Sequence, residues 1–173
     1  GVAEQNMAGI AAGLALSGKK PYIYSIIPFI TMRCFEQIRN DICCQNLDVK
    51  IIGIGAGFSY DVFGSTHHAL EDISIFRSLP NITILSPADP TEAKQLIIES
   101  YKSKKPTYIR LDKSDNYLIN EKSKIKISKP NIIKLGKDTL VITTGAILKE
   151  VMGAIKKIAE KGFNLELISL HTL

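Results

Sequence analysis

The sequence predicts an α/β fold, in which a parallel sheet has helices on both faces and is followed by the start of a second α/β domain. Three observations predict it. Strand and helix signals alternate over residues 4–111, the alternation stops in a polar, lysine-rich stretch, and it resumes near residue 139. Strands that alternate with helices are typical of parallel sheets covered on both faces. The 173 residues are enough for one ordinary domain and part of a second.

The first predicted helix, over residues 4–17, consists almost wholly of small and apolar residues behind a single acid, Glu4. Gly9 and Gly13 are four residues apart, so they share a face on which another backbone can approach. We therefore expect this helix to pack closely against a neighbour. An acid at the start of a helix also complements the helix dipole, and this explains Glu4 as readily as a role in chemistry does.

The elements that follow have the order of a parallel α/β sheet. They are a strand over 21–27, a helical pattern over 30–46, a strand over 49–54, a Gly-rich loop, a short helix over 70–79, a strand over 82–86, a helix from Asp89 onwards and a strand over 107–111. The strands are short β-branched or aromatic runs, which is typical of buried strands. Asp89 is the predicted N-cap of its helix, with Pro90 at the first helical position and Glu92 in the first turn.

The pattern collapses after Lys113. The stretch 114–130 is polar and rich in lysine, so we predict a first domain over 1–115, a linker over 116–130 and a second domain over 131–173. The second domain is expected to contain strands in TLVITTGA and LELISL, with a helix from about Leu148 to Lys161 between them. It is too short to close its own sheet, and the chain begins inside an apparent motif, so we expect both domains to be incomplete.

Composition narrows the class of protein. Hydrophobic residues make up 45% and charged residues 23% of the chain, as in globular proteins. The net charge of +5 comes from scattered lysines and one linker-like run, which does not indicate a nucleic-acid-binding protein. The odd number of cysteines (Cys34, Cys43 and Cys44) argues against a disulfide framework and indicates a reducing, cytoplasmic setting. We find no signal peptide and no membrane-spanning run, and expect no membrane partner.

Several candidate site residues are expected at the carboxyl ends of the strands, where parallel α/β sheets bind ligands. In chain order they are Glu4, Phe29, Arg33, Asp61, Ser65, Thr66, His67, His68, Arg110 and Lys113. Acids, an aromatic ring, two histidines and cations at one edge favour a small-molecule site. Each also has an ordinary structural explanation, since aromatic residues such as Phe29 are more often in the core. The two adjacent histidines lack a third ligand at motif spacing, so we predict no metal site in this chain.

Four segments, in order and at sensible spacings, resemble a known family. They are GVAEQNMAGIAAGLA, PYIYSIIPFITMRCFEQIRND, GSTHHALEDISIFRSLPNITILSPAD and DTLVITTGA. Together they resemble the pyrimidine-binding, C-terminal section of transketolases, and the same layout is found in 1-deoxy-xylulose-5-phosphate synthases and in the β subunits of 2-oxo-acid dehydrogenases. The resemblance implies the thiamine-diphosphate pyrimidine-binding fold. It also implies a transferase that moves a two-carbon ketol unit between sugars by means of thiamine diphosphate.

The resemblance implies cofactor contacts for three residues. Glu4 matches the acid that bonds the pyrimidine ring nitrogen of thiamine diphosphate. A carboxyl group there favours the imino tautomer of the cofactor, whose nitrogen takes the proton from the thiazolium carbon. Phe29 matches the aromatic residue that packs on the pyrimidine ring, and Arg33, close by in the same segment, is expected to bind the cofactor as well.

The resemblance also implies substrate contacts. His67 matches a histidine that faces the reacting substrate and can transfer protons, and His68 is adjacent to it. Lys113 falls where relatives place a cation for the substrate phosphate, with Arg110 nearby. Phe63 is a departure from the family pattern, because many sugar-using members have an acid at that position, four residues before the histidine. The usual sugar-phosphate specificity is therefore in doubt.

The resemblance finally implies a partner. In this family the diphosphate and its Mg²⁺ are held by a separate domain with a GDG-type motif, and this sequence contains no such motif. We therefore expect a diphosphate-binding (N-terminal) transketolase subunit or domain, and a homo- or hetero-oligomer whose site is built at the interface. Three alternatives are open. They are the β subunit of a 2-oxo-acid dehydrogenase or a 1-deoxy-xylulose-5-phosphate synthase-like enzyme, a non-catalytic partner subunit, and a plain α/β ligand-binding domain.

Overall fold

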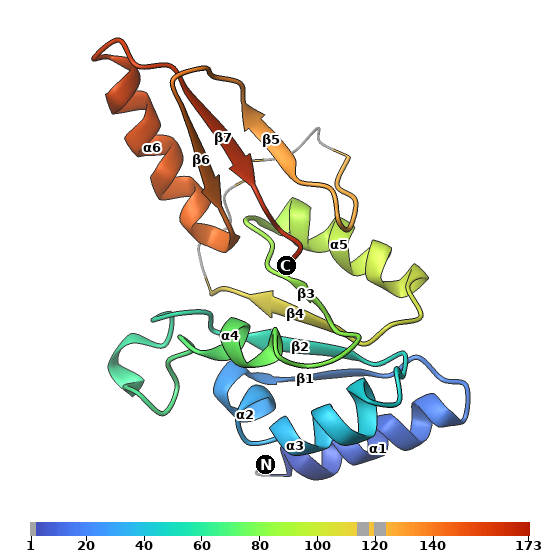
Figure 1. Cartoon of the computed structure of the whole chain (residues 1–173). Helices are drawn as coiled ribbons and strands as arrows, with labels where there is room; N and C mark the ends of the chain where they lie inside the picture. The colour runs from blue at the N-terminus through green and yellow to red at the C-terminus, as the bar shows by residue number, and fades with distance from the viewer. Residues whose placement is uncertain (1–2, 114–117, 120–123) are drawn as a thin grey trace.

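Two sheets organise the chain (Figure 1). The computed structural model describes residues 3–113, 118–119 and 124–173. The first sheet is parallel, in the order β1-β2-β4-β3, and contains β1 (Tyr22–Ile26), β2 (Lys50–Ile54), β3 (Thr83–Leu85) and β4 (Thr107–Leu111). The second has the order β5-β7-β6 and contains β5 (Asn131–Lys134), β6 (Thr139–Thr143) and β7 (Leu165–Ser169). The predicted fold class, a parallel sheet flanked by helices and then the start of a second α/β unit, is confirmed.

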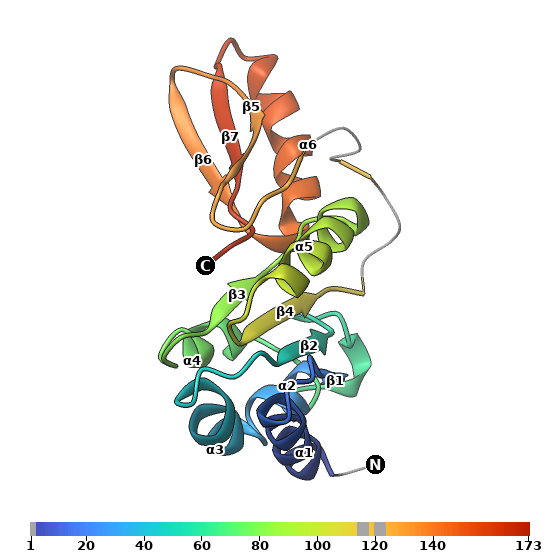
Figure 2. The same cartoon turned by 90° about the vertical axis from the view of Figure 1, so that its right-hand side faces the viewer.

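Helices cover both faces of the first sheet (Figure 2). They are α1 (Glu4–Leu16), α2 (Ile27–Thr31), α3 (Phe35–Gln37), α4 (Asp72–Phe76) and α5 (Pro90–Lys102), and α6 (Leu148–Ala159) belongs to the second sheet. Ile51, Tyr108 and Ile84 lie in one buried cluster with residues of α1 and α4. The next residue along β4, Ile109, faces the opposite way and packs with Leu96 of α5. This alternation is the period-two pattern of a strand buried on both sides.

The segment predicted as one helix over 30–46 is broken, and that prediction was wrong. Helix α2 already begins at Ile27, directly after β1, with Pro28 in its first turn, where the missing N–H of proline costs no hydrogen bond. A turn follows at Arg33, whose carbonyl oxygen accepts a hydrogen bond of 3.1 Å from the Gln5 side chain. After α3 the chain continues as a π-helical turn, η1 (Ile38–Cys43). The turn places Arg33 opposite the first turn of α1.

The start of α5 is formed as predicted. Asp89 is its N-cap and accepts a hydrogen bond of 2.7 Å from the backbone N–H of Glu92. The Glu92 carboxylate in turn accepts one of 2.6 Å from the backbone N–H of Ala88. This is the reciprocal arrangement of a capping box. Because the Glu92 side chain is fully buried in the described structure, burial raises its pKa to about 7.

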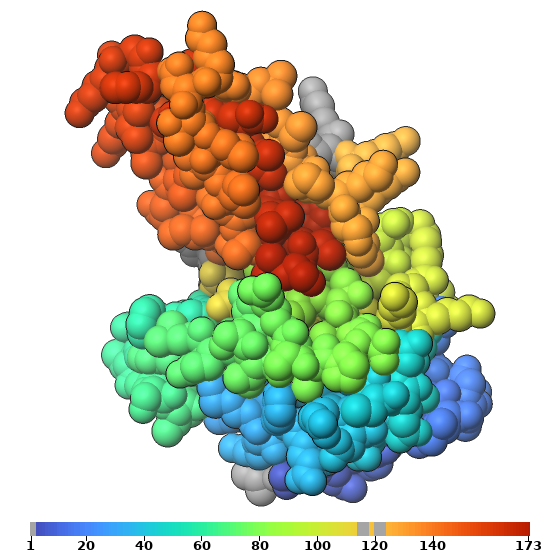
Figure 3. All heavy atoms as spheres, viewed as in Figure 1, coloured from blue at the N-terminus to red at the C-terminus, as the bar shows by residue number. Residues whose placement is uncertain are grey.

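The second sheet joins the first at the end of β3. The backbone N–H of Ser86 donates to the carbonyl oxygen of His171 at 2.8 Å, and that of Leu173 donates to Ile84 at 2.9 Å. Figure 3 shows the two units in direct contact. Strands β6 and β7 and helix α6 are formed as predicted, whereas β5, which pairs antiparallel with β7, was not expected as a separate strand.

Part of the predicted linker packs against the first unit. Ile125 is only 5% exposed and lies in a cluster with Leu85 and Ile109. Residues 114–117 and 120–123 of that linker lie outside the described residues. None of the helices that the structure describes is long and apolar enough to cross a membrane.

Candidate functional site

Three segments that carry predicted site residues start side by side at one edge of the first sheet. In the register of the sheet, Ile26 at the end of β1 pairs with Ile54 at the end of β2, and Ile54 pairs with Leu111 at the end of β4. Helix α2 follows β1, the Gly-rich loop follows β2, and Lys113 follows β4. The backbone N–H of Gly55 donates to the Leu111 carbonyl oxygen at 2.9 Å, which fixes the start of the loop beside β4.

Glu4 lies at the first position of α1 and is only 7% exposed. Arg33 Nη1 donates a hydrogen bond of 2.7 Å to its Oε2 atom. A hydrogen bond from the residue's own backbone, followed by the one from Arg33, lowers the pKa of the Glu4 carboxyl. Glu4 also lines a cavity of about 300 Å³ together with Ala3, Met7, Tyr24 and Ser25. An anionic carboxylate therefore stands at the edge of a cavity, paired with one cation.

Phe29 connects Arg33 to His67. The guanidinium carbon of Arg33 lies 4.5 Å from the centre of the Phe29 ring, in a cation–π contact. The Phe29 ring also contacts the His67 imidazole edge to face, with ring centres 5.1 Å apart. Phe29 comes from the first turn of α2, whereas His67 comes from the loop after β2. The half-buried aromatic ring thus joins two segments that are far apart in the chain.

Aromatic rings surround His67. Besides Phe29, Phe63 lies 5.1 Å and Tyr60 lies 5.6 Å from the imidazole, measured between ring centres. The Thr66 hydroxyl oxygen lies 2.9 Å from Nδ1 of the same imidazole. Phe63 therefore presents a ring to His67 at the position where the resemblance implies an acid.

Tyr60 contacts Lys113 as well as His67. The Lys113 ammonium lies 4.3 Å from the centre of the Tyr60 ring. Tyr60 was not predicted as a site residue, although the glycine at position 55 indicates that something packs closely against the backbone there. Gly55 has φ +91°, and a Cβ atom there would lie 2.1 Å from the Tyr60 ring, so only glycine leaves room for this ring.

We call six of the residues joined by these contacts the site cluster; they are Glu4, Arg33, Phe29, His67, Tyr60 and Lys113. Five of the six were predicted from the sequence. They come from α1, from α2 and the turn after it, from the loop after β2, and from the end of β4. The site cluster combines a carboxylate, a flat aromatic face, an imidazole and two cations, which is a set able to bind a ring and move a proton.

Two predicted substrate-binding residues, His68 and Arg110, make other contacts. Nε2 of His68 lies 2.9 Å from the carbonyl oxygen of Asp61, and its ring packs against Phe58. Arg110 Nε donates a hydrogen bond of 2.8 Å to the buried carboxylate of Asp72, and Nη2 donates to the Ala69 carbonyl oxygen at 3.2 Å. The structure therefore shows neither residue in contact with the site cluster. Instead, Arg110 anchors the end of the Gly-rich loop.

The Tyr108 hydroxyl completes this anchor. It donates a hydrogen bond of 2.7 Å to the Asp72 carboxylate that binds Arg110. Burial first, and then the charge of Asp72, raise the pKa of Tyr108, so its hydroxyl keeps its proton. Asp72 is thus held by two donors from β4, and the loop that carries His67 is attached to the sheet through it.

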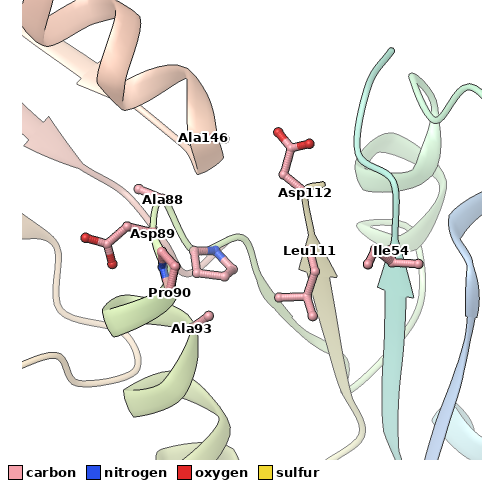
Figure 4. A pocket seen from close by; sticks show the side chains of 9 residues that line it. Ile54, Ala88, Asp89, Pro90, Ala93, Leu111, Asp112 and Ala146 are labelled. Atoms are coloured by element: carbon pink, nitrogen blue, oxygen red, sulfur yellow. The ribbon is translucent and has the colours of Figure 1, made fainter. Parts of the chain in front are cut away.

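A second cavity, at the same edge of the sheet, is lined by residues outside the site cluster (Figure 4). It measures about 200 Å³ and is lined by Ile54, Pro87, Ala88, Asp89, Pro90, Ala93, Leu111, Asp112 and Ala146. Its two acids are engaged by the protein, since Asp89 caps α5 and Asp112 accepts hydrogen bonds from the Ser59 hydroxyl and from the Lys113 backbone N–H. Among the described residues, no group of three or more His, Cys, Asp or Glu side chains could hold a metal ion.

Comparison with known proteins identifies similar sequences along the whole chain. The sequence profile described as "Transketolase, pyrimidine binding domain" matches residues 1–117. An apulose-4-phosphate transketolase subunit from Actinobacillus succinogenes is 34% identical over 174 aligned positions, which cover 100% of this chain and 56% of that protein. A 1-deoxy-D-xylulose-5-phosphate synthase from Halothermothrix orenii is 33% identical, over 98% of this chain and 27% of that protein. The chain thus spans about half the length of the first of these relatives.

Solved structures agree with the sequence comparison. One described as a split-gene transketolase, in the form of an inactive tetramer, superposes with a TM-score of 0.89 and 30% sequence identity. The match covers 98% of this chain and 55% of that one. The similarity therefore includes the second sheet as well as the first.

Proposed function

The chain belongs to the transketolase family through its pyrimidine-binding domain, and from this premise we propose that it supplies the pyrimidine-binding half of a transketolase-like enzyme. Such an enzyme transfers a two-carbon ketol unit from a ketose to an aldose, with thiamine diphosphate as cofactor. The observation that carries the proposal is the site cluster, in which Arg33 links an acid to an aromatic face and that face contacts a histidine.

The residues present fit the pyrimidine ring of the cofactor. Glu4 offers a carboxylate at the edge of a cavity of about 300 Å³. Phe29 offers a flat ring, which the Arg33 guanidinium connects to that carboxylate. The guanidinium group of Arg33, which is planar and donates hydrogen bonds, contacts both the Glu4 carboxylate and the Phe29 ring. When bound, thiamine diphosphate supplies a carbon nucleophile and an electron sink. The proposed part of Glu4 is to hold a proton at the pyrimidine nitrogen, and that of Phe29 is to fix the plane of the ring.

His67 is the proposed residue for proton transfer with the substrate. The Thr66 hydroxyl is within hydrogen-bond distance of Nδ1, so Nε2 is the nitrogen that we assign to a substrate hydroxyl. Lys113, beside Tyr60, is the proposed contact for an anionic group of the substrate. Because Phe63 presents an apolar ring to His67, we assign the recognition of a substrate hydroxyl to the imidazole. The proposed substrate is a small sugar or sugar phosphate.

A second subunit is part of the proposal. The A. succinogenes relative is described as one subunit of a transketolase, and the structural relative as a split-gene transketolase whose tetramer is inactive. We therefore propose that a diphosphate-binding subunit or domain completes the site, that it holds the diphosphate and Mg²⁺, and that the assembly works in the cytoplasm. The part of Arg110 and His68 in this scheme is to hold the loop around His67, as their contacts with Asp72 and Asp61 favour.

A 1-deoxy-xylulose-5-phosphate synthase-like activity is the second candidate, and the similarity to the H. orenii enzyme favours it. A non-catalytic role is less well supported, because both Glu4 and His67 are present and in one cluster. The donor separates the two activities, since a transketolase takes a ketose and a synthase of this kind takes pyruvate.

The test is a donor screen with the full-length chain mixed with its diphosphate-binding partner, thiamine diphosphate and Mg²⁺. Ketol transfer from a ketose to an aldehyde is the expected result. Decarboxylation of pyruvate coupled to condensation would support the second candidate instead. A complex that binds thiamine diphosphate but turns over neither donor would refute both.

A further inference from the structure

The Arg33 side chain makes the two contacts that the pyrimidine ring of the cofactor is expected to make. Its Nη1 atom donates to Glu4 Oε2 at 2.7 Å, and its guanidinium carbon lies 4.5 Å from the centre of the Phe29 ring. A guanidinium group is flat and cationic, and carries N–H donors along its edge. A protonated aminopyrimidine is also flat and cationic, with N–H donors along one edge. We call the position between the Glu4 carboxylate and the Phe29 ring, which the guanidinium group of Arg33 spans, the notch. A carboxylate on one side and an aromatic face on the other suit both groups.

We propose that Arg33 is an internal occupant of the pyrimidine position, which must leave the notch between Glu4 and Phe29 before thiamine diphosphate can bind. This inference rests on the proposed function, because it assumes that Glu4 and Phe29 hold the pyrimidine. It gives Arg33 a different part from the direct cofactor contact expected from the resemblance. Arg33 competes with the ring rather than binding it.

The occupant has a reason to be there. The Glu4 side chain is only 8% exposed, and a carboxylate with so little contact to water is costly when it has no partner. Arg33 supplies that partner and, with the residue's own backbone, favours the charged form of Glu4. Once Arg33 has left, the Glu4 carboxylate would share a proton with the pyrimidine nitrogen of the cofactor instead. The proposed exchange therefore leaves Glu4 paired both before and after cofactor binding.

Moving the Arg33 side chain out of the notch requires little free energy. The Arg33 side chain is 37% exposed, so solvent screens its ion pair with Glu4. Its backbone is held separately, because the Gln5 side chain donates to the Arg33 carbonyl oxygen at 3.1 Å. Rotation of the side chain into solvent therefore leaves the turn between α2 and α3 in place. The exchange requires a change of rotamer and no rearrangement of the fold.

The test is the affinity of the assembled complex for thiamine diphosphate, measured by calorimetry in the presence of Mg²⁺, for wild type, Arg33→Met and Arg33→Gln. Removal of the competitor is expected to lower the Kd roughly tenfold, or about 1.4 kcal/mol. Loss of an exposed ion pair and loss of an exposed cation–π contact each change an equilibrium constant by a factor of a few. The two factors multiplied give the expected change in Kd. Arg39→Met is the matched control, because Arg39 is exposed in the same segment and, in the described structure, its guanidinium group donates to the neighbouring Asn40. We expect it to leave the Kd unchanged.

The outcomes separate this inference from the function on which it rests. If thiamine diphosphate binds the wild-type complex, and Arg33→Met and Arg33→Gln both assemble but bind it as well as wild type or more weakly, then Arg33 is not a competitor and the inference is wrong. Light scattering shows whether each variant assembles. If the wild-type complex binds no thiamine diphosphate, the proposed function is refuted and the inference is refuted with it.

Discussion

Replacing Glu4 by glutamine is expected to remove nearly all turnover while the fold survives. The substitution keeps the size of the side chain but removes its charge and its ability to hold a proton at the pyrimidine nitrogen. The loss in folding free energy has two parts, the helix-dipole interaction and an ion pair with a partner that is 37% exposed. Together these amount to about 1 kcal/mol. Loss of a hydrogen-bonding group that acts in the transition state lowers kcat by about 10²- to 10³-fold.

The assay is steady-state ketol transfer by the assembled complex at saturating thiamine diphosphate, together with urea unfolding of the chain. Glu36→Gln is the matched control, because Glu36 is an exposed acid in the first turn of α3. That variant is expected to keep its turnover. If Glu4→Gln folds, binds the cofactor and still works within tenfold of the wild-type rate, Glu4 does not have the assigned role.

Three further substitutions test the rest of the account. His67→Ala is expected to lower kcat/KM for the donor by about 100-fold and to leave the affinity for thiamine diphosphate unchanged, as steady-state kinetics and calorimetry would measure. Asp72→Ala leaves Arg110 without its buried partner, so the free energy of unfolding in urea is expected to fall by about 3–5 kcal/mol. The pKa of Glu92 is about 7 in the folded chain, against an ordinary value of 4.5. The folded chain therefore holds this proton more tightly than the unfolded chain does. The resulting stabilisation is complete below pH 4.5 and is lost as the pH rises from 4.5 to 7. Glu92→Gln is expected to remove this loss, of up to roughly 3 kcal/mol, from urea unfolding measured across that range.

Each of these variants has a matched control. His68→Ala removes the neighbouring histidine, which contacts Asp61 and Phe58 instead of the site cluster, and should affect donor kinetics less than His67→Ala; equal effects would contradict the assignment of His67. Tyr108→Phe removes one hydrogen bond from Asp72 and should cost about 1 kcal/mol. If Asp72→Ala is as stable as Tyr108→Phe, the buried ion pair between Asp72 and Arg110 contributes little to the free energy of unfolding.

The control for Glu92→Gln is Glu99→Gln, a partly exposed acid on the same helix, α5, that is paired with Lys102. Wild type and Glu99→Gln should show the same dependence of unfolding free energy on pH. If Glu92→Gln follows that curve too, Glu92 is not the group that titrates.

Local chemistry made part of the fold predictable. The cap of α5 depends on Asp89 and Glu92, which are three residues apart, and the pattern of the sequence contains both. Strand β4 was placed at its observed bounds, Thr107–Leu111, because a buried β-branched run between turn signals has few other solutions. The break after α2 was not predictable in the same way, because it involves a hydrogen bond between Gln5 and Arg33, 28 residues apart.

The same distinction applies to the site cluster. Five members were found because their residue types are suited to chemistry and because strand ends gather at one edge of a parallel sheet. Tyr60 was missed, since its position depends on the room that Gly55 leaves for its ring. The partner of Arg110 was missed as well, because Asp72 precedes it by 38 residues and a buried pair of that kind leaves no local pattern.

The central claim is that this chain holds only the pyrimidine end of thiamine diphosphate and needs a second subunit for the rest. The most direct measurement is calorimetric titration of thiamine diphosphate and Mg²⁺ into the full-length chain, alone and mixed with its diphosphate-binding partner. We expect binding in the mixture and none by the chain alone. Equally tight binding by the chain alone would contradict the claim of a shared site, and binding by neither would contradict the assignment of the cofactor.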